Sequence, residues 1–252
     1  TIKGAGQDKT FISFKGQTGA GEGLLITSDN VTVTGFTMED PKGDGIKSKG
    51  ADNITYKDLK VVWTGGPLTT NGAYGVYPVE SKNVLIDGVT VSGASDAGIY
   101  VGQSENIIVR NSRAEYNVAG IEIENSTNAD VHDNVATHNA GGILVFDLPD
   151  LPVKGGHSTR VFNNQIVEND TQNFAPPGNI VAGVPTGTGV LLMANRNVHV
   201  FGNTFDKNQT THVMVVSYVN TFTDAQYNPL PRDFVIRDNT YGDGGNAPQG
   251  RL

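Results

Sequence analysis

The residues of this chain that could do chemistry follow a glycine–aliphatic pair that recurs along the sequence. The pairs are Gly45-Ile46, Gly75-Val76, Gly98-Ile99, Gly120-Ile121, Gly142-Ile143 and Gly189-Val190. The residues directly after them are Lys47, Tyr77, Tyr100, Glu122, Leu144 and Leu191. Two positions further on stand Lys49, Val79, Gly102, Glu124, Phe146 and Met193. Aromatic rings beside carboxylates are common in sugar-binding sites, because a pyranose ring has an apolar face and a rim of hydroxyl groups.

These side chains, with three from irregular segments, predict one ligand-binding face. Its expected members are Trp63, Tyr77, Tyr100, Glu122, Glu124, Asp147 and His157. Trp63 is the only Trp of the chain, and an exposed indole beside two tyrosines would give a sugar or a partner residue a stacking platform. The alternative is that tyrosines on neighbouring strands stack on one another and only stabilise a sheet surface.

Two kinds of catalysis can be compared with these residues. Uronan lyases and epimerases remove a proton next to a carboxylate, which requires an acid, a base and a group that neutralises the carboxylate. Tyr77 or Tyr100 could be the acid or base, and Lys47 or Arg110 the neutralising group. Inverting glycoside hydrolysis needs a cluster of carboxyl groups at suitable separations. The candidates for that reaction are scattered over successive repeats: Asp44, Asp96 and Asp147. The catalytic residues therefore stay unassigned; any enzyme activity is expected to be that of a polysaccharide lyase, an epimerase or a glycoside hydrolase.

Metal and cofactor signals are weak. Glu122, Glu124 and Asp147 could supply oxygen ligands for Ca²⁺, but the nonapeptide that builds calcium-binding β-rolls is absent. The five His residues show no metal-ligand spacing, which favours solvated surface side chains. The chain has no Cys, which excludes disulfides, thiolate metal sites and covalent c-type haem. We expect no cofactor.

Charge and hydropathy limit the partners. The formal net charge is −8 and no basic run occurs, which argues against nucleic acid as a partner. No stretch approaches the roughly 20 apolar residues that span a bilayer. Thr1 opens in the middle of a pattern, so we expect a processed or disordered segment before it.

The elements that must position these residues follow a repeat. Asn recurs at positions 30, 53, 83, 106 and 128, with spacings of 23, 30, 23 and 22 residues, and again at 197. A unit of 22–23 residues without a helical period is too short for a βαβ unit and fits one coil of a solenoid. We therefore predict an all-β, single-stranded, right-handed parallel β-helix of about seven to eight coils that forms one domain over residues 1–252.

Details of the repeat predict the interior and the turns. The aliphatic member of each pair is expected to point inward and the residue after it outward. The recurring Asn residues and a second series, Asn134, Asn164, Asn203 and Asn239, are expected to form side-chain ladders in turns. The segments 62–73, 147–157 and 168–187 interrupt the repeat, and long loops on a regular scaffold often carry function or only shield the sheets.

Longer runs of the chain resemble a known family. The runs 73–89 (AYGVYPVESKNVLIDGV), 95–111, 117–131 and 141–152, with GAGQDKT at 4–10 and the segment 173–190, resemble bacterial exported right-handed parallel β-helix repeat proteins of pectin-lyase-like fold. The resemblance covers essentially the whole chain. It implies an extracytoplasmic location (periplasmic, outer-membrane lipoprotein or secreted) and a gene neighbourhood with a c-type cytochrome-like protein, and it implies no activity.

A wider resemblance reaches pectate lyases, polygalacturonases and alginate C5-epimerases. The epimerase motif Tyr-Gly-x-Asp-Pro-His-Asp is matched here by Tyr74-Gly75-Val76-Tyr77-Pro78-Val79-Glu80, in which both Asp residues and the His are replaced. That activity is therefore not carried over.

Two functions compete, and a purely structural role is a third alternative. The first is binding, with or without processing, of a polysaccharide. The second is a non-catalytic scaffold for a partner protein such as an exported c-type cytochrome, docked at the apolar positions Leu144, Phe146, Leu191 and Met193.

Overall fold

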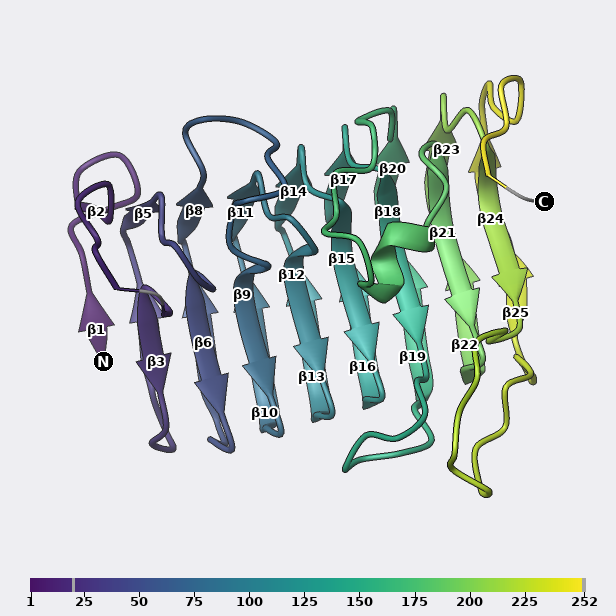
Figure 1. The fold of residues 1–252 in the computed structure, drawn as a ribbon, viewed down its shortest axis with the longest axis horizontal. Helices are drawn as coiled ribbons and strands as arrows, with labels where there is room; N and C mark the ends of the chain where they lie inside the picture. The colour runs from purple at the N-terminus through teal and green to yellow at the C-terminus, as the bar shows by residue number, and fades with distance from the viewer. Residues whose placement is uncertain (20, 251–252) are drawn as a thin grey trace.

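The structure is a computed structural model that describes residues 1–19 and 21–250. Its short strands form three parallel sheets stacked along one axis (Figure 1). Sheet A contains β1 (Ile2–Lys3), β4 (Thr32–Thr34), β7 (Ile54–Lys57), β10 (Lys82–Asp87), β13 (Glu105–Arg110), β16 (Thr127–His132), β19 (His157–Phe162), β22 (Arg196–Phe201) and β25 (Val235–Arg237). Sheet B contains β2 (Phe11–Ser13), β5 (Thr37–Glu39), β8 (Lys60–Val62), β11 (Thr90–Ser92), β14 (Arg113–Glu115), β17 (Val135–Thr137), β20 (Gln165–Val167), β23 (Thr204–Asp206) and β26 (Thr240–Tyr241). Sheet C contains β3 (Leu24–Ile26), β6 (Ile46–Lys49), β9 (Tyr74–Val79), β12 (Ala97–Gly102), β15 (Ala119–Glu124), β18 (Gly141–Phe146), β21 (Thr188–Met193) and β24 (Thr211–Val216).

The chain visits sheets A, B and C in turn, so that three successive strands make one coil. The described part of the chain forms eight complete coils and two strands of a ninth. The predicted all-β solenoid is confirmed, with a partial coil more than expected. One short 3-10 helix, η1 (Ile180–Gly183), stands between β20 and β21. Within residues 1–19 and 21–250 no helix has the length and apolar character needed to cross a membrane.

The predicted aliphatic stack fills the interior. Its members pair across neighbouring coils in the order Ile46, Val76, Ile99, Ile121, Ile143 and Val190. Each of them is fully buried in the main hydrophobic cluster. Each coil thus covers the apolar face of the next, as nearest-neighbour stacking requires.

Asparagine ladders connect the coils at the turns. In the exposed ladder the Asn53 amide donates to Asn30, and Asn83, Asn106 and Asn128 continue the series at 2.7–3.2 Å. These residues have φ between 57° and 60°, a left-handed conformation that Asn tolerates better than most residues. Ser158 replaces Asn in the next coil and accepts a hydrogen bond from Asn197.

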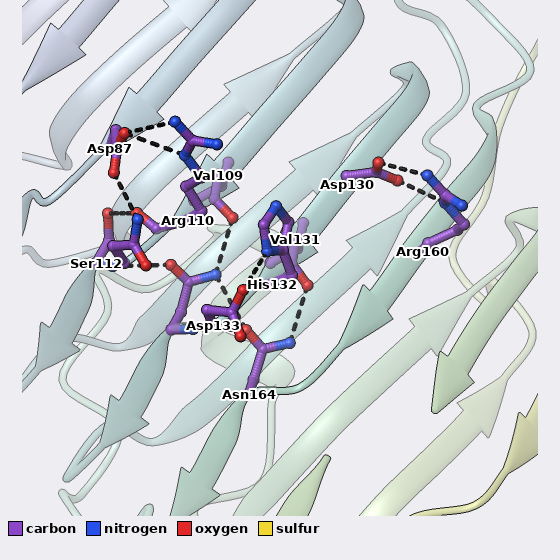
Figure 2. A network of polar contacts seen from close by, with 12 residues as sticks. Asp87, Val109, Arg110, Ser112, Asp130, Val131, His132, Asp133, Arg160 and Asn164 are labelled. Carbon is purple, nitrogen blue, oxygen red and sulfur yellow. Dashed lines mark hydrogen bonds and ion pairs between the residues drawn. The ribbon is translucent and has the colours of Figure 1, made fainter. Parts of the chain in front are cut away.

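A second, buried ladder joins sheets A and B. The Nδ2 of Asn164 donates to Asn203 and to the carbonyl of Val131, each at 2.9 Å, as Figure 2 shows for the bond to Val131. Both predicted series are thereby confirmed as ladders. A third series, not recognised in the sequence, lies between sheets B and C and is fully buried: Asn117, Asn139, Asn169 and Asn208.

The long connections all flank sheet C. From the second coil onward sheets A and B are joined by two residues in every coil. The segments 63–73 and 168–187 lead into sheet C, and the segments 147–156 and 217–234 lead out of it. Figure 1 shows them above and below the strands of this sheet. The outer face of sheet C is therefore the face that the irregular parts of the chain can reach.

Candidate functional site

The outer face of sheet C carries the predicted column of side chains. Lys47 pairs with Tyr77, Tyr100 with Glu122, and Glu122 with Leu144. Neighbouring coils of a parallel sheet lie about 4.8 Å apart, so one ligand can touch several of these residues. The outward orientation is confirmed, because the inward partners on the same strands form the interior stack.

This face is nevertheless largely covered. The expected exposed docking patch is wrong, since Leu144, Phe146, Leu191 and Met193 are at most 9% exposed. The reason is that the long segments place their own apolar side chains over sheet C. The side chains that pack against the patch include Phe174, Val181, Val184, Tyr218 and Tyr227. Figure 1 shows η1 crossing in front of sheet C near β15 and β18.

A cleft remains between the covering segment and the middle of the sheet. Its volume is about 290 Å³. Its lining consists of Tyr74, Asp96, Tyr100, Glu122, Glu124, Leu148 and residues 178–181. The middle of the outward column thus forms an acidic and aromatic hollow under a loop.

Hydrogen bonds fix two of the three carboxylates. The Tyr100 hydroxyl donates to Oε1 of Glu124 at 2.6 Å, and Nδ2 of Asn179 donates to Oδ2 of Asp96 at 2.9 Å. Asn179 directly precedes η1, so this bond ties segment 168–187 to the coil that contains β12. Glu122 is 2% exposed, and its Oε2 has no hydrogen-bond partner among the described residues.

Burial and mutual repulsion keep these acids from ionising readily. Desolvation raises the pKa of Asp96 to about 7, although the Asn179 hydrogen bond opposes the shift. Desolvation likewise raises the pKa of Glu124 to about 7, and the Tyr100 hydrogen bond opposes it. The pKa of Glu122 is raised well above its usual value by burial and then by the charges of Asp96 and Glu124. Carboxyl groups with such shifts mark functional sites more often than surface acids do.

Three tyrosines stand together at the cleft. The ring centroids of Tyr74, Tyr77 and Tyr100 are 4.4–4.9 Å apart in each pair. Burial raises the pKa of Tyr77 to about 12 and raises those of Tyr74 and Tyr100 further. Their hydroxyl groups are therefore neutral donors near neutral pH. The Nζ of Lys47 lies 4.6 Å from the Tyr77 ring centroid.

The structure brings four of the seven predicted site residues together: Tyr77, Tyr100, Glu122 and Glu124. Asp147 lies beside them, where its carboxylate accepts a hydrogen bond from the Gly156 amide and closes the 147–156 loop. His157 begins β19 in sheet A and is outside the lining of the cleft.

The expected exposed Trp63 is wrong. Its side chain is 4% exposed and belongs to the interior cluster, and its indole Nε1 donates to the carbonyl of Pro41 at 2.8 Å. Arg110 is also no neutralising group for this cleft, because it extends from sheet A and pairs with Asp87 (Figure 2).

The sequence did not predict three polar lining residues as members of this site: Tyr74, Asp96 and Asn179. The sequence offered Asp96 only as one of three scattered candidates for inverting glycoside hydrolysis. Among the described residues, no group of three or more His, Cys, Asp or Glu side chains is placed to hold a metal ion.

Comparisons with known proteins agree with the architecture. A family model described as "Right handed beta helix region" matches residues 4–156. The A-module of a mannuronan C-5 epimerase from Azotobacter vinelandii superposes with a TM-score of 0.52 at 16% identity, covering 89% of this chain and 62% of that one. A double mutant of a periplasmic alginate epimerase gives 0.55 at 13% identity, with 86% and 61% covered.

A third solved structure is a tailspike protein of E. coli bacteriophage HK620 in complex with a pentasaccharide. It gives a TM-score of 0.57 at 14% identity and covers 94% of this chain and 47% of that one. The chain thus spans less than two thirds of the length of each of these three proteins, and at such identities the likeness shows the fold alone. A search of curated proteins found no match.

Proposed function

This chain belongs to the right-handed β-helix family, and from that premise we propose that it binds a carbohydrate in the cleft on the outer face of sheet C. The observation that carries the proposal is a cleft lined by Tyr74, Tyr100 and three buried carboxyl groups, with Tyr77 packed against both tyrosines at its border. Aromatic rings can pack on the apolar face of a pyranose, and the acids and hydroxyl groups can bond its rim.

The position of the cleft supports the proposal. Segment 168–187 supplies residues 178–181 to the lining of the cleft and segment 147–156 supplies Leu148, and loops on a rigid scaffold commonly form binding sites. The mannuronan epimerase, the alginate epimerase and the tailspike named above are proteins of the same fold with saccharide ligands or substrates in their names. An extracytoplasmic location, such as the periplasm, is part of the proposal.

Titration calorimetry after a glycan-array screen tests the proposal. Tyr77→Ala removes the ring at the border of the cleft and is expected to weaken binding of the selected glycan at least tenfold. Phe162→Ala is a matched control, because Phe162 also stacks between two aromatic rings but on sheet A. Equal losses in both variants, or a correctly folded protein that binds no glycan, would contradict carbohydrate binding at this cleft.

The cleft also holds groups suited to processing its ligand. A carboxyl group with a pKa of about 7, as at Asp96 and Glu124, can donate or accept a proton near neutral pH. Incubation with the selected oligosaccharide, followed by assays for new reducing ends, unsaturated products and C-5 inversion, separates a binding protein from a hydrolase, a lyase or an epimerase.

A second candidate function is docking of a partner protein, favoured by an apolar pocket at the other end of the covered face. This pocket has a volume of about 310 Å³, and the partly exposed Met214, Val216 and Tyr218 line it above the buried Phe146, Leu191 and Met193. Pull-down from a periplasmic extract with the native protein and with Val216→Glu tests it. Retention of the same partner by both proteins would contradict docking at this pocket.

A further inference from the structure

We propose that the cleft selects a sugar that carries a protonated amine, so that its preferred ligand is an amino sugar rather than a uronate or a neutral sugar. This inference rests on the proposed carbohydrate binding and adds the substrate class. Its starting point is the charge of the lining, which differs from what an anionic polysaccharide would need.

The lining is acidic without a compensating cation. Asp96, Glu122 and Glu124 face the cleft, and no Lys, Arg or His is among the described residues that line it. The nearby cation at the tyrosine cluster, Lys47, is already paired with Glu22 at 3.2 Å and with Asp44 at 3.4 Å. A uronate carboxylate placed here would add another negative charge to acids that already raise one another's pKa, with no cation to neutralise it.

A buried acceptor without a donor points to the missing ligand group. Glu122 is almost fully buried, its Oε2 has no partner, and it lines the cleft. Buried polar atoms in native proteins nearly always have hydrogen-bond partners, so an orphaned one calls for an explanation. A ligand that brings a donor would satisfy it.

An ammonium group supplies what this arrangement lacks. It carries three donors and a positive charge, and charge-assisted hydrogen bonds to carboxylates are stronger than neutral ones. Tyr100 holds one oxygen of Glu124 and Asn179 holds one oxygen of Asp96. A cation beside these acids lowers their pKa values, so Glu122 releases its proton to solvent when the ammonium group binds. Its carboxylate and the second oxygen of each of the other two acids can then accept from the ligand.

The tyrosines also favour a positively charged group on the ligand. Tyr74 and Tyr100 line the cleft with ring centroids 4.4 Å apart, and aromatic faces attract cations. Lys47 over the Tyr77 ring shows a cation already held this way at the border of the cluster. The aromatic wall can therefore contact both the apolar face of a sugar ring and a neighbouring ammonium group.

Calorimetry at pH 7 and low ionic strength tests this with four tetrasaccharides of β-1,4-linked rings: fully deacetylated glucosamine, its N-acetylated form, cellotetraose and, as the anion, mannuronate. The native protein is expected to bind the glucosamine tetramer at least tenfold more tightly than the other three. Glu122→Gln keeps the shape of the side chain and is expected to reduce this preference to less than threefold. Glu105→Gln makes the same substitution at an exposed position on sheet A and should leave the preference intact.

The outcomes separate the two proposals. Binding of several tetramers without an amine preference would overturn the amino-sugar inference and leave carbohydrate binding in place. An unchanged preference in a Glu122→Gln protein that melts cooperatively would do the same. Calcium binding to the native protein that Glu122→Gln abolishes, without any amine preference, would also overturn it. Binding of no saccharide here or on the glycan array would overturn both.

Discussion

The hydroxyl of Tyr100 on β12 donates a 2.6 Å hydrogen bond to Glu124 on β15, one coil further along the helix. Both side chains point outward from sheet C, yet they are only 5% and 8% exposed. The pair joins an aromatic and an acidic part of the cleft through a bond that water reaches poorly. Removal of this hydrogen bond is therefore expected to change both the stability of the protein and the proposed ligand binding.

Tyr100→Phe removes this bond and leaves the other partner buried. Loss of one partner of a buried hydrogen bond to a charged or titrating group costs about 1–3 kcal/mol. Because the bond lowers the pKa of Glu124, we expect that pKa to rise further in the variant. Urea denaturation measures the first effect, and carboxyl-resolved NMR titration measures the second. An unchanged Glu124 titration would show that the hydroxyl does not contact the acid in solution.

Glu122→Gln is expected to stabilise the protein at alkaline pH. The pKa of Glu122 is raised in the folded state, so the folded state binds its proton more tightly than the unfolded state does. The stabilising effect of that proton is present below the unfolded-state pKa and is lost as the pH rises toward the folded-state pKa. Gln does not titrate, so the variant should melt like the native protein near pH 4 and at a higher temperature at pH 8. The gain is about 1.4 kcal/mol for every tenfold difference in proton affinity between the folded and the unfolded state.

Thermal melts of both proteins between pH 4 and pH 8 measure this difference. Glu105→Gln, at an exposed position paired with Lys82, is the matched control and should show no such pH-dependent gain. A Glu122→Gln protein less stable than the native one at pH 8 would mean that the carboxylate is better solvated than its burial indicates.

Ile121→Asp is expected to prevent folding. Ile121 is fully buried between Ile99 and Ile143, and an unpaired carboxylate there costs several kcal/mol. Ile108→Asp on sheet A is the control, because Ile108 is 38% exposed. Circular dichroism and soluble yield report the outcome. A cooperatively melting Ile121→Asp protein would contradict the inward orientation of the aliphatic stack.

The two kinds of Asn ladder should differ in energetic weight. Asn164→Ala leaves the carbonyl of Val131 and the backbone N–H of Asn134 without their partners in a buried turn. We expect the free energy of unfolding to fall by about 2–4 kcal/mol. Asn106→Gly removes an exposed rung at a residue with φ of 58°, which Gly adopts easily, and should cost less than about 1 kcal/mol. Chemical denaturation measures the free energy of unfolding of both variants. Equal decreases would show that burial does not determine how much an Asn–Asn hydrogen bond stabilises the protein.

The sequence was informative wherever the repeat is regular. The spacing of the Asn residues predicted the coil length, and the glycine–aliphatic pairs predicted the interior stack and the outward column with Tyr77, Tyr100 and Glu122. These features depend only on strand alternation and on nearest-neighbour stacking, which a single sequence contains.

The missed residues lie where alternation fails or where distant segments meet. Counted from Val76, alternation sends Tyr74 inward, but Gly75 faces the interior next to Val91, so Tyr74 packs with the outer cluster. The same alternation, counted from the buried Val61, would have sent Trp63 inward. Asn179 reaches Asp96 across 83 positions of sequence, and no local pattern encodes such a contact.

The uneven lengths of the three kinds of connection also decide where this molecule can accept new sequence. Between sheets A and B the two-residue turn repeats in every coil from the second onward, and from Asn134 to Asn239 these turns carry the buried ladder. An inserted residue there would push the amides of that ladder out of reach. At the two margins of sheet C the connections range from two to 20 residues on an unchanged strand register. A foreign peptide grafted at one of these margins would be held beside the outer face of sheet C without disturbing the stacking of the coils, so the protein could display engineered loops next to its own cleft.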